Sequence, residues 1–339
     1  MPFQIVHTFL QKVVLQFIFL SICYFFSGNT FAQWFKDKQS IMGTEIRIEF
    51  WLDEENKNKG KLLLKKVITE MRRIDELMSP FKKESEISRV NRLAASQKVT
   101  ISNEMFNLIQ KSIEISELTQ GAFDITFASI GNLYDYRLKI KPAKNQINNN
   151  LNKINYKHLQ LFRPDQSIKF SQAGVVIDLG GIAKGHAVDK SIDILKDNGV
   201  KHGLVSAGGD TRIIGDHRGR PWITGIRNPR IPGKSAILIP LSNIAISTSG
   251  DYERFFIEDG VRYHHIISPK TGYSISSVQS VSVIGPDSTT CDALSTSLFV
   301  LGTRKALNLI NTIADFDAII IDAEGKLHFS DGLKTQKSK

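Results

Sequence analysis

The sequence predicts an α+β fold. Short apolar segments that end in glycine or serine occur between amphipathic helical segments, and the two kinds follow one another without a repeat of fixed period. The chain has 339 residues, enough for one large or two modest domains with a full hydrophobic core. With 41% hydrophobic and 23% charged residues, its composition is that of a globular protein rather than a disordered one.

Residues 1–32 have the pattern of a secretory signal peptide. Lys12 is followed by an apolar run of about 14 residues, too short for the roughly 20 that a membrane span needs. Thr30 and Ala32 fit the small-residue rule for cleavage before Gln33. We therefore expect an exported protein, periplasmic or otherwise extracytoplasmic. A retained anchor at the outer face of the inner membrane stays open.

Charge and cysteine content limit the partners. Cleavage would leave Cys291 as the one cysteine, so the mature chain has no internal disulfide. The net charge of +10 would fall to +9 with the loss of Lys12, which favours anionic partners or is simply a solvated basic surface. Zinc spacing, an Arg-rich arm and interleaved aromatic and basic residues are all missing from the sequence, so we expect no nucleic-acid partner.

The first half of the chain predicts one strand and two helices. Residues 43–52 alternate like a strand, and residues 61–79 have helical spacing that ends before Pro80. Residues 101–121 predict a helix capped near Ser102 and stopped at Gly121. The Asn- and Lys-rich segment 141–158 is typical of a surface connection. We expect a single domain over residues 33–335, with lobes at about 33–140 and 160–335.

The second half predicts strands that run into glycine or serine, followed by helices. Such strands are expected in 173–181, 202–210 and 243–251, and another strand in 278–286. Helices are expected over 183–199, 289–302 and 303–316, and residues 317–329 predict a hairpin around Glu324-Gly325.

Residues 175–189, "VVIDLGGIAKGHAVD", predict a phosphate site. A strand that ends at Asp178 leads through two glycines to a helix starting near Ala183, where backbone N–H groups and Lys184 could hold an anion. The spacing matches neither the P-loop nor GxGxxG, so it assigns no nucleotide. The alternative is a tight turn whose glycines only permit close packing. "SAGGD" and "STSGD" favour the functional interpretation, because three such turns suggest a shared anionic crevice.

A histidine pair could supply a base. His264 and His265 are adjacent, so a strand would turn their rings to opposite faces and at most one would face a site. A histidine with an ordinary pKa near 6.5 suits proton removal near neutral pH. The alternative is a half-buried strand histidine with a satisfied hydrogen bond. A serine hydrolase that uses Ser249 and His265 is disfavoured because "TSGD" lacks the G-x-S-x-G elbow.

A carboxylate and a hydroxyl stand four residues apart in "PDSTTCDALSTSLFV". On a helix starting near Thr290, Asp292 and Thr296 share one face, with Ser295 beside them. A first-turn Asp292 would favour the helix dipole by about 0.3–1 kcal/mol without any other role. The alternative is a hard-cation site, for which Mg²⁺ is the better match because it needs few protein ligands. The spacing alone does not separate these interpretations.

The motifs together resemble one family, the FAD:protein FMN transferases, or ApbE family. The resemblance runs from residue 42 to residue 302 and includes, in the family's order, "MSPFKKESEISRVN", "GAFDIT", "DLGGIAKGHAVD", "SAGGD", "ISTSGDYERFF", "YHHIISPKTG" and "DALSTSLFVLG". It implies a two-lobed fold with the flavin nucleotide between the lobes. It also implies a Mg²⁺-dependent reaction in which FAD is the substrate, FMN passes to a Thr or Ser of an acceptor flavoprotein through a phosphoester bond, and AMP leaves.

The resemblance also implies roles for individual residues. His265 matches the general base and His264 does not. The flavin site would involve Met42, Phe81, Ala122, Phe123 and Asp124. Asp178, Lys184 and Ile267 would contact the diphosphate and adenylate, and the metal would be held by Gly181, Asp292, Ser295 and Thr296. Ser268 stands where the family more often has Asp, which puts support of His265 from that position in doubt.

Two other functions compete with transfer. A Mg²⁺-dependent FAD pyrophosphatase would use water as acceptor on the same scaffold. A non-catalytic flavin-binding protein would need no metal, so Asp292 and Thr296 argue against it. The family analogy implies that the acceptor is a membrane redox subunit or an extracytoplasmic FMN-binding domain, and the sequence does not name it.

Overall fold

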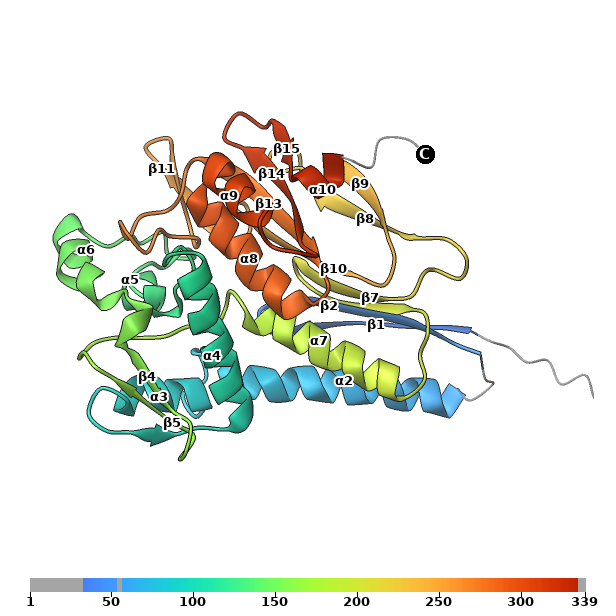
Figure 1. Cartoon of the computed structure of the whole chain (residues 1–339), viewed down its shortest axis with the longest axis horizontal. Coiled ribbons are helices and arrows are strands. Elements are labelled where there is room, and N and C mark those ends of the chain that lie inside the picture. The colour runs from blue at the N-terminus through green and yellow to red at the C-terminus, as the bar shows by residue number, and fades with distance from the viewer. Residues whose placement is uncertain (1–32, 54–56, 335–339) are drawn as a thin grey trace, which may run out of the picture.

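The computed structural model describes residues 33–53 and 57–334, which form helices and sheets as the sequence predicts (Figure 1). The predicted signal peptide, residues 1–32, lies outside the described residues. Within the described part of the chain, no helix is both long and apolar enough to cross a membrane.

A single eight-stranded antiparallel sheet organises the fold. Its strand order is β1-β2-β6-β7-β10-β13-β14-β15. The strand bounds are β1 (Gln33–Ile41), β2 (Thr44–Leu52), β6 (Gly203–Ala207), β7 (Asp210–Ile214), β10 (Ala245–Gly250), β13 (Val278–Gly285), β14 (Asp317–Asp322) and β15 (Leu327–Phe329). The lobe boundaries stay a prediction, but the sheet crosses them, because β2 from the first half pairs with β6 from the second.

Helices cover one face of this sheet: α2 (Lys57–Met78), α7 (Ala183–Asp197), α8 (Ser288–Leu301) and α9 (Thr303–Ile310) (Figure 1). Alternate side chains of each strand point to opposite faces. Val281 and Val283 therefore pack in the core that contains Leu294 and Leu298 of α8. Ile284 instead joins the core under the hairpin β8 (Trp222–Arg227) and β9 (Ser235–Leu241). The sheet is thus buried on both faces.

Most of the other elements surround one end of this sheet (Figure 1). The helices there are α3 (Glu86–Leu93), α4 (Asn103–Leu118), α5 (Ala128–Gly131) and α6 (Lys144–Asn150), with the 3-10 turns η1 (Ile125–Phe127), η2 (Leu151–Lys153) and η3 (Tyr156–His158). The short helix α10 (Asp331–Lys334) instead lies beside β14 (Figure 1), and its Leu333 packs against the core under the β8–β9 hairpin. A small sheet has the order β3-β5-β4. Its strands are β3 (Val99–Thr100), β4 (Leu159–Phe162) and β5 (Ser167–Phe170), and a separate ribbon joins β11 (Phe255–Glu258) to β12 (Val261–His264).

The predicted strand that ends at Asp178 is wrong. Residues 175–179 are buried in part, yet they form no strand. The side chain of Asn91 replaces a strand partner: the Ile177 N–H donates to Asn91 Oδ1 and Asn91 Nδ2 donates to the Ile177 carbonyl, each at 2.9 Å. The apolar pattern therefore predicted the burial of this segment correctly. Its hydrogen bonds, however, are made with the side chain of Asn91 rather than with a neighbouring strand.

Helices α4 and α7 are connected by an ion-pair network that we expect to stabilise the start of α7. Glu104 Oε1 lies 2.7 Å from His186 Nε2, and Glu104 Oε2 lies 2.7 Å from an Arg73 guanidinium nitrogen. The hydrogen bond from His186, followed by the contacts of Arg73, lowers the pKa of Glu104 to about 2 although burial raises it. This network fixes the helix turn that also carries Lys184.

Replacing Glu104 with glutamine should therefore lower stability in a pH-dependent way. A carboxyl whose folded-state pKa is lowered stabilises the fold above its ordinary pKa of 4.5, and this contribution is lost as pH falls toward about 2. After allowance for solvent screening, we expect a loss of about 1–2 kcal/mol at pH 7. Thermal unfolding should show this loss at pH 7 and a smaller one at pH 3. The exposed Glu117→Gln is the control, and equal losses at both pH values would contradict the assignment.

Candidate functional site

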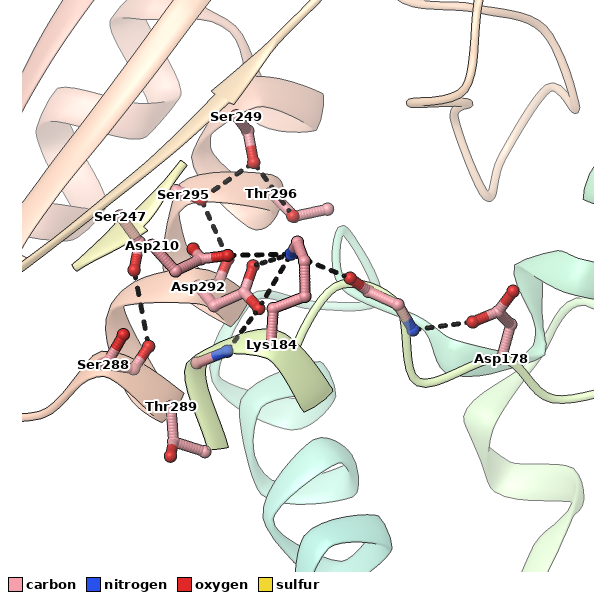
Figure 2. A network of polar contacts seen from close by, with 12 residues as sticks. Asp178, Lys184, Asp210, Ser247, Ser249, Ser288, Thr289, Asp292, Ser295 and Thr296 are labelled. Carbon is pink, nitrogen blue, oxygen red and sulfur yellow. Dashed lines mark hydrogen bonds and ion pairs between the residues drawn. The ribbon is translucent and has the colours of Figure 1, made fainter. Parts of the chain in front are cut away.

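The ammonium of Lys184 lies between two buried carboxylates (Figure 2). Its Nζ is 2.9 Å from Asp210 Oδ2 and 3.2 Å from Asp292 Oδ2. It also donates to the Gly180 carbonyl at 3.2 Å. Because Asp210 and Asp292 are only 1% and 3% exposed, this is a charged cluster inside the protein rather than a surface ion pair.

Gly185 allows helices α7 and α8 to approach closely enough to form this cluster. A Cβ at Gly185 would lie 2.2 Å from the Ser288 carbonyl oxygen, so any side chain there would push the helices apart. The Gly185 N–H donates to Asp292 Oδ2 at 3.1 Å. Asp189, one turn further along α7, accepts the N–H groups of Ser288 and Thr289 at 2.9 and 2.8 Å. The start of α8 is thus held against α7.

The cluster contains two carboxyl groups and one ammonium. Burial and the nearby Asp210 raise the pKa of Asp292 to about 7, although Lys184 lowers it. Burial lowers the pKa of Lys184, but Asp210 and Asp292 outweigh it and raise that pKa above its usual value. A further cation beside two buried carboxyl groups and a single ammonium would stabilise the charged form of the carboxylates.

Asp292 does not belong to the helix start. Helix α8 begins at Ser288, and its N-cap is Asp287, whose carboxylate accepts the Thr290 N–H at 2.7 Å. Asp292 therefore lies beyond the first turn, so the alternative in which it only favours the helix dipole from that turn does not hold. A buried carboxylate in the second turn needs a different explanation.

Hydroxyl groups line the same face of α8. Ser249 Oγ lies 2.8 Å from Ser295 Oγ and 3.1 Å from Thr296 Oγ1 (Figure 2). A Cβ on Gly181 would be 3.4 Å from Thr296 Oγ1, so this glycine is adjacent to the hydroxyl. The predicted metal residues Gly181, Asp292, Ser295 and Thr296 therefore do come together. The Ser249 hydroxyl is engaged by Ser295 and Thr296 rather than by a histidine, which argues against a serine hydrolase.

The donor set suits a hard cation. Carboxylate, hydroxyl and carbonyl oxygens are the ligands that Mg²⁺ takes in proteins. Ser295 is the weakest candidate, because its hydroxyl also donates to the Asp292 carbonyl at 2.9 Å. In the described residues no group of three or more His, Cys, Asp or Glu side chains could hold a metal. A metal here would be held by Asp292 together with neutral oxygens. Such a set binds the ion weakly, and the substrate phosphate would complete its coordination.

The two adjacent histidines have different environments. His264, the last residue of β12, is 1% exposed, and its Nε2 lies 2.6 Å from the Ile275 carbonyl. Its Nδ1 accepts the Ile266 N–H at 3.3 Å, so both ring nitrogens are used. His265 lies just beyond the strand, and its buried Nδ1 has no hydrogen-bond partner among the described residues. His264 is a core residue with both ring nitrogens in use, whereas His265 has one ring nitrogen without a partner among the described residues.

His265 is neutral at physiological pH. Burial, followed by the nearby His264, Arg254 and Lys184, lowers its pKa to about 3. A neutral imidazole can accept a proton, as a general base must. Ser268 gives His265 no carboxylate support: its hydroxyl oxygen accepts the Lys270 N–H at 3.2 Å in the turn around Pro269.

Residues 42–320 match the family model of the ApbE family. The chain belongs to the ApbE family. The FAD:protein FMN transferases of Treponema pallidum and Vibrio cholerae are 30% and 31% identical to it, over 80% and 78% of this chain and 80% and 81% of their own.

Solved ApbE structures share the fold. The ApbE protein of Thermotoga maritima superposes with a TM-score of 0.83 at 33% identity, covering 91% of this chain and 100% of its own. The flavin transferase ApbE of Vibrio cholerae gives a TM-score of 0.80 at 28% identity, covering 90% and 99%. The α+β, ApbE-like fold expected from the sequence is thereby confirmed.

The residues that the ApbE resemblance assigns to the flavin lie on several elements. Ala122, Phe123 and Asp124 are buried between α4 and η1, and Phe123 Cε2 would be 3.3 Å from a Cβ on Gly181. This places Phe123 beside Gly181, one of the predicted metal residues. The Asp124 carboxylate accepts the N–H groups of Thr126 and Tyr156 at 2.9 and 2.8 Å, so it also holds its own loop together.

The remaining ApbE-derived residues differ in exposure. Phe81, in the turn before α3, is 82% exposed, and Ile267 is buried at 3%. Met42 occupies the β1–β2 turn with a positive φ of 55°. Burial raises the pKa of Asp178, against the effect of the Gly180 N–H that donates to it at 2.6 Å. Contacts of these residues with flavin or phosphate stay predictions.

Two residues of the site were missed by sequence reasoning. Asp210 follows the glycines of "SAGGD", and its role appears only when Lys184 is seen beside it. Arg254 is exposed, and its charge lowers the pKa of both Asp178 and His265. A Cβ on Gly43 would lie 3.2 Å from Arg254 Nη2, which places the guanidinium beside Met42 as well. The acidic end of "SAGGD" and the arginine in "GDYERFF" were the available signals.

Proposed function

We propose that this protein is a Mg²⁺-dependent FAD:protein FMN transferase. It moves FMN from FAD to a Thr or Ser hydroxyl of an acceptor flavoprotein, forms a phosphoester bond and releases AMP. Support comes from ApbE relatives that carry this name over about four-fifths of the chain. The observation that carries the proposal most is the position of Asp292 and Thr296, beside Gly181 and Lys184.

Positive groups would hold the substrate diphosphate. Phosphoryl transfer asks the protein mainly for positioning and for stabilisation of charge. Lys184 and Arg254 both lie near enough to Asp178 and His265 to lower the pKa of each. The flavin would extend toward Met42, Phe81 and the segment 122–124, in a crevice between the two halves of the chain. Ile267 would add a contact around the diphosphate and adenylate.

A bound Mg²⁺ would be held by Asp292, Thr296 and the Gly181 carbonyl, with Ser295 as a further candidate. It would supply neutralisation of the charge that builds on the phosphates during transfer. The two buried carboxyl groups beside a single ammonium, and the raised pKa of Asp292, are the observations that favour a cation there.

His265 would take the proton from the acceptor hydroxyl. The hydroxyl oxygen then forms a bond to the FMN-side phosphorus, the bond from that phosphorus to the AMP oxygen breaks, and AMP carries away the electron pair. The lowered pKa keeps the ring of His265 in its neutral form before the acceptor arrives, but does not by itself make it a strong base.

Replacing Arg254 with glutamine should weaken FAD binding. The neighbouring carboxylates are already paired, Glu253 with Arg227 and Asp251 with Arg230. Arg254 is therefore available for a phosphate, and a charge-assisted hydrogen bond of this kind implies about a tenfold rise in Kd for FAD. Isothermal titration should show this rise, with Arg254→Lys closer to wild type. Arg227→Gln is the matched control, and no rise for Arg254→Gln would remove this residue from the site.

The proposal is tested with the mature protein, FAD, Mg²⁺ and a purified extracytoplasmic FMN-binding domain. Transfer gives flavin fluorescence on the acceptor band after denaturing electrophoresis, and a chelator abolishes it. Free FMN and AMP formed equally well without the acceptor would instead identify a pyrophosphatase. FAD left intact in the presence of Mg²⁺ would point to a flavin-binding protein.

The location and the acceptor belong to the same proposal. The pattern of residues 1–32 supports export to the periplasm or another extracytoplasmic space. The acceptor would be a membrane redox subunit or an extracytoplasmic FMN-binding domain that presents a Thr or Ser. Secretion of a tagged full-length chain, measured by fractionation, tests the location.

A further inference from the structure

The two-stranded ribbon of β11 and β12 runs directly to His265. Phe255 of β11 lies opposite His264 of β12 in an antiparallel ladder. The ladder continues one residue further, because the His265 N–H donates to the Arg254 carbonyl at 3.1 Å. The proposed base is therefore joined to the ribbon through its backbone.

The register of this ladder shows which backbone groups point outward. In antiparallel pairs, residues that exchange hydrogen bonds alternate with residues that do not. Because Arg254 and His265 are a bonded pair, the next pair, Phe255 and His264, turns its backbone groups away from the ribbon. The same alternation turns the N–H and carbonyl of Ile257 outward along the free side of β11.

The two outer edges of the ribbon differ. On the β12 side, the His264 N–H donates to Ser274 Oγ at 2.9 Å and the Ser274 hydroxyl donates to the His264 carbonyl at 2.7 Å. That edge is closed beside the base. On the other side, β11 has β12 as its single strand partner in the described chain. Figure 1 shows β11 at the periphery of the molecule, at the upper left.

The open edge is also apolar. Phe255 and Ile257 of β11 are 37% and 56% exposed. Proteins usually protect an open edge with lysine, proline or a bulge, because it is a template for another strand. The sequence of β11, "FFIE", has none of these in its first three positions, and Glu258 at its far end is paired with Lys141.

We propose that the outer edge of β11 binds an extended segment of the acceptor protein as an added strand. This inference rests on the transferase function proposed above and names how its protein substrate is held. Main-chain hydrogen bonds to Phe255 and Ile257 would align the segment. The segment then leads past Arg254 toward His265, which must come within hydrogen-bond reach of the acceptor hydroxyl. Recognition through the main chain also tolerates acceptors with different side chains.

Ile257→Pro tests the inference most sharply. The Ile257 N–H points away from β12, so proline removes the donor for an added strand without removing a ladder bond. With a purified extracytoplasmic FMN-binding domain as acceptor, kcat/KM for the acceptor should fall about tenfold or more through a rise in its KM, which is the effect of losing one or two main-chain bonds. The KM for FAD should stay as in the wild type, which also shows that the variant is folded.

Two further variants separate backbone recognition from other effects. Ile257→Thr keeps the N–H and should stay within about threefold of wild type, whereas Ile257→Lys introduces an edge-protecting charge and should lower kcat/KM like proline. Wild-type kcat/KM for the acceptor in both Ile257→Pro and Ile257→Lys would overturn the inference. So would a wild-type dimer that Ile257→Lys makes monomeric while transfer is unchanged, since the edge would then belong to a second copy. Failure of the wild type to label any acceptor would refute the transferase function itself, before a variant is made.

Discussion

Replacing His265 with alanine should lower kcat for FMN transfer by about 10²–10⁴-fold, the usual contribution of a general base. The Kd for FAD should change by less than about threefold, because the ring is assigned to the acceptor proton rather than to the nucleotide. Single-turnover transfer to the acceptor domain and titration with FAD measure the two quantities separately.

The control for His265→Ala is another partly exposed histidine. His158 bonds the Asn152 carbonyl and the Ser171 hydroxyl in the small-sheet region. His158→Gln should therefore leave transfer unchanged. Because the pKa of free His265 is about 3, lowering the pH from 8 to 6 should not protonate this residue before substrate binds. Wild-type transfer rates in His265→Ala would exclude this histidine as the base.

Replacing Asp292 with asparagine should remove most Mg²⁺-dependent activity, by about 10²-fold or more, since it removes the one carboxylate of the proposed ligand set. Its effect on the fold should be small, because Lys184 keeps its ion pair with Asp210 at 2.9 Å. Calorimetric titration with Mg²⁺ in the presence of FAD should show weaker binding of the ion. This readout does not depend on turnover.

The matched control lies on the neighbouring helix. Asp193 is an exposed carboxylate of α7, and Asp193→Asn should keep both activity and Mg²⁺ affinity. If Asp292→Asn binds Mg²⁺ as tightly as the wild type does, the metal site lies elsewhere. If it unfolds near room temperature, Asp292 is a structural member of the buried cluster instead.

Much of the fold could be predicted because local patterns agree with it. The alternation in 43–52 became β2, and the N-cap expected at Ser102 accepts the Met105 N–H at 3.2 Å. The segment 175–179 failed because its apolar pattern reports burial, whereas its hydrogen bonds depend on Asn91, which is 86 positions from Ile177. Sequence periodicity carries no information about a partner so distant.

In the candidate site, too, some residues could be predicted from the sequence and others could not. Asp292 and Thr296 could be paired from their spacing, because four residues place two side chains on one face of a helix. Asp210 and Arg254 could not, since their importance arises from contacts with Lys184 and from proximity to His265 that only the folded chain creates. The difference between His264 and His265 likewise needed the structure, because it lies in which ring already has partners.

The central claim is that the AMP half of FAD is released because its FMN half is attached to a protein. The measurement that tests it most directly compares AMP released, by chromatography, with FMN bound to the acceptor, by intact mass. Transfer predicts equal amounts of the two at every time point, and neither product when the acceptor Thr or Ser is replaced by alanine. AMP in excess, matched by free FMN and unaffected by loss of the acceptor hydroxyl, would contradict transfer and make the protein a hydrolase.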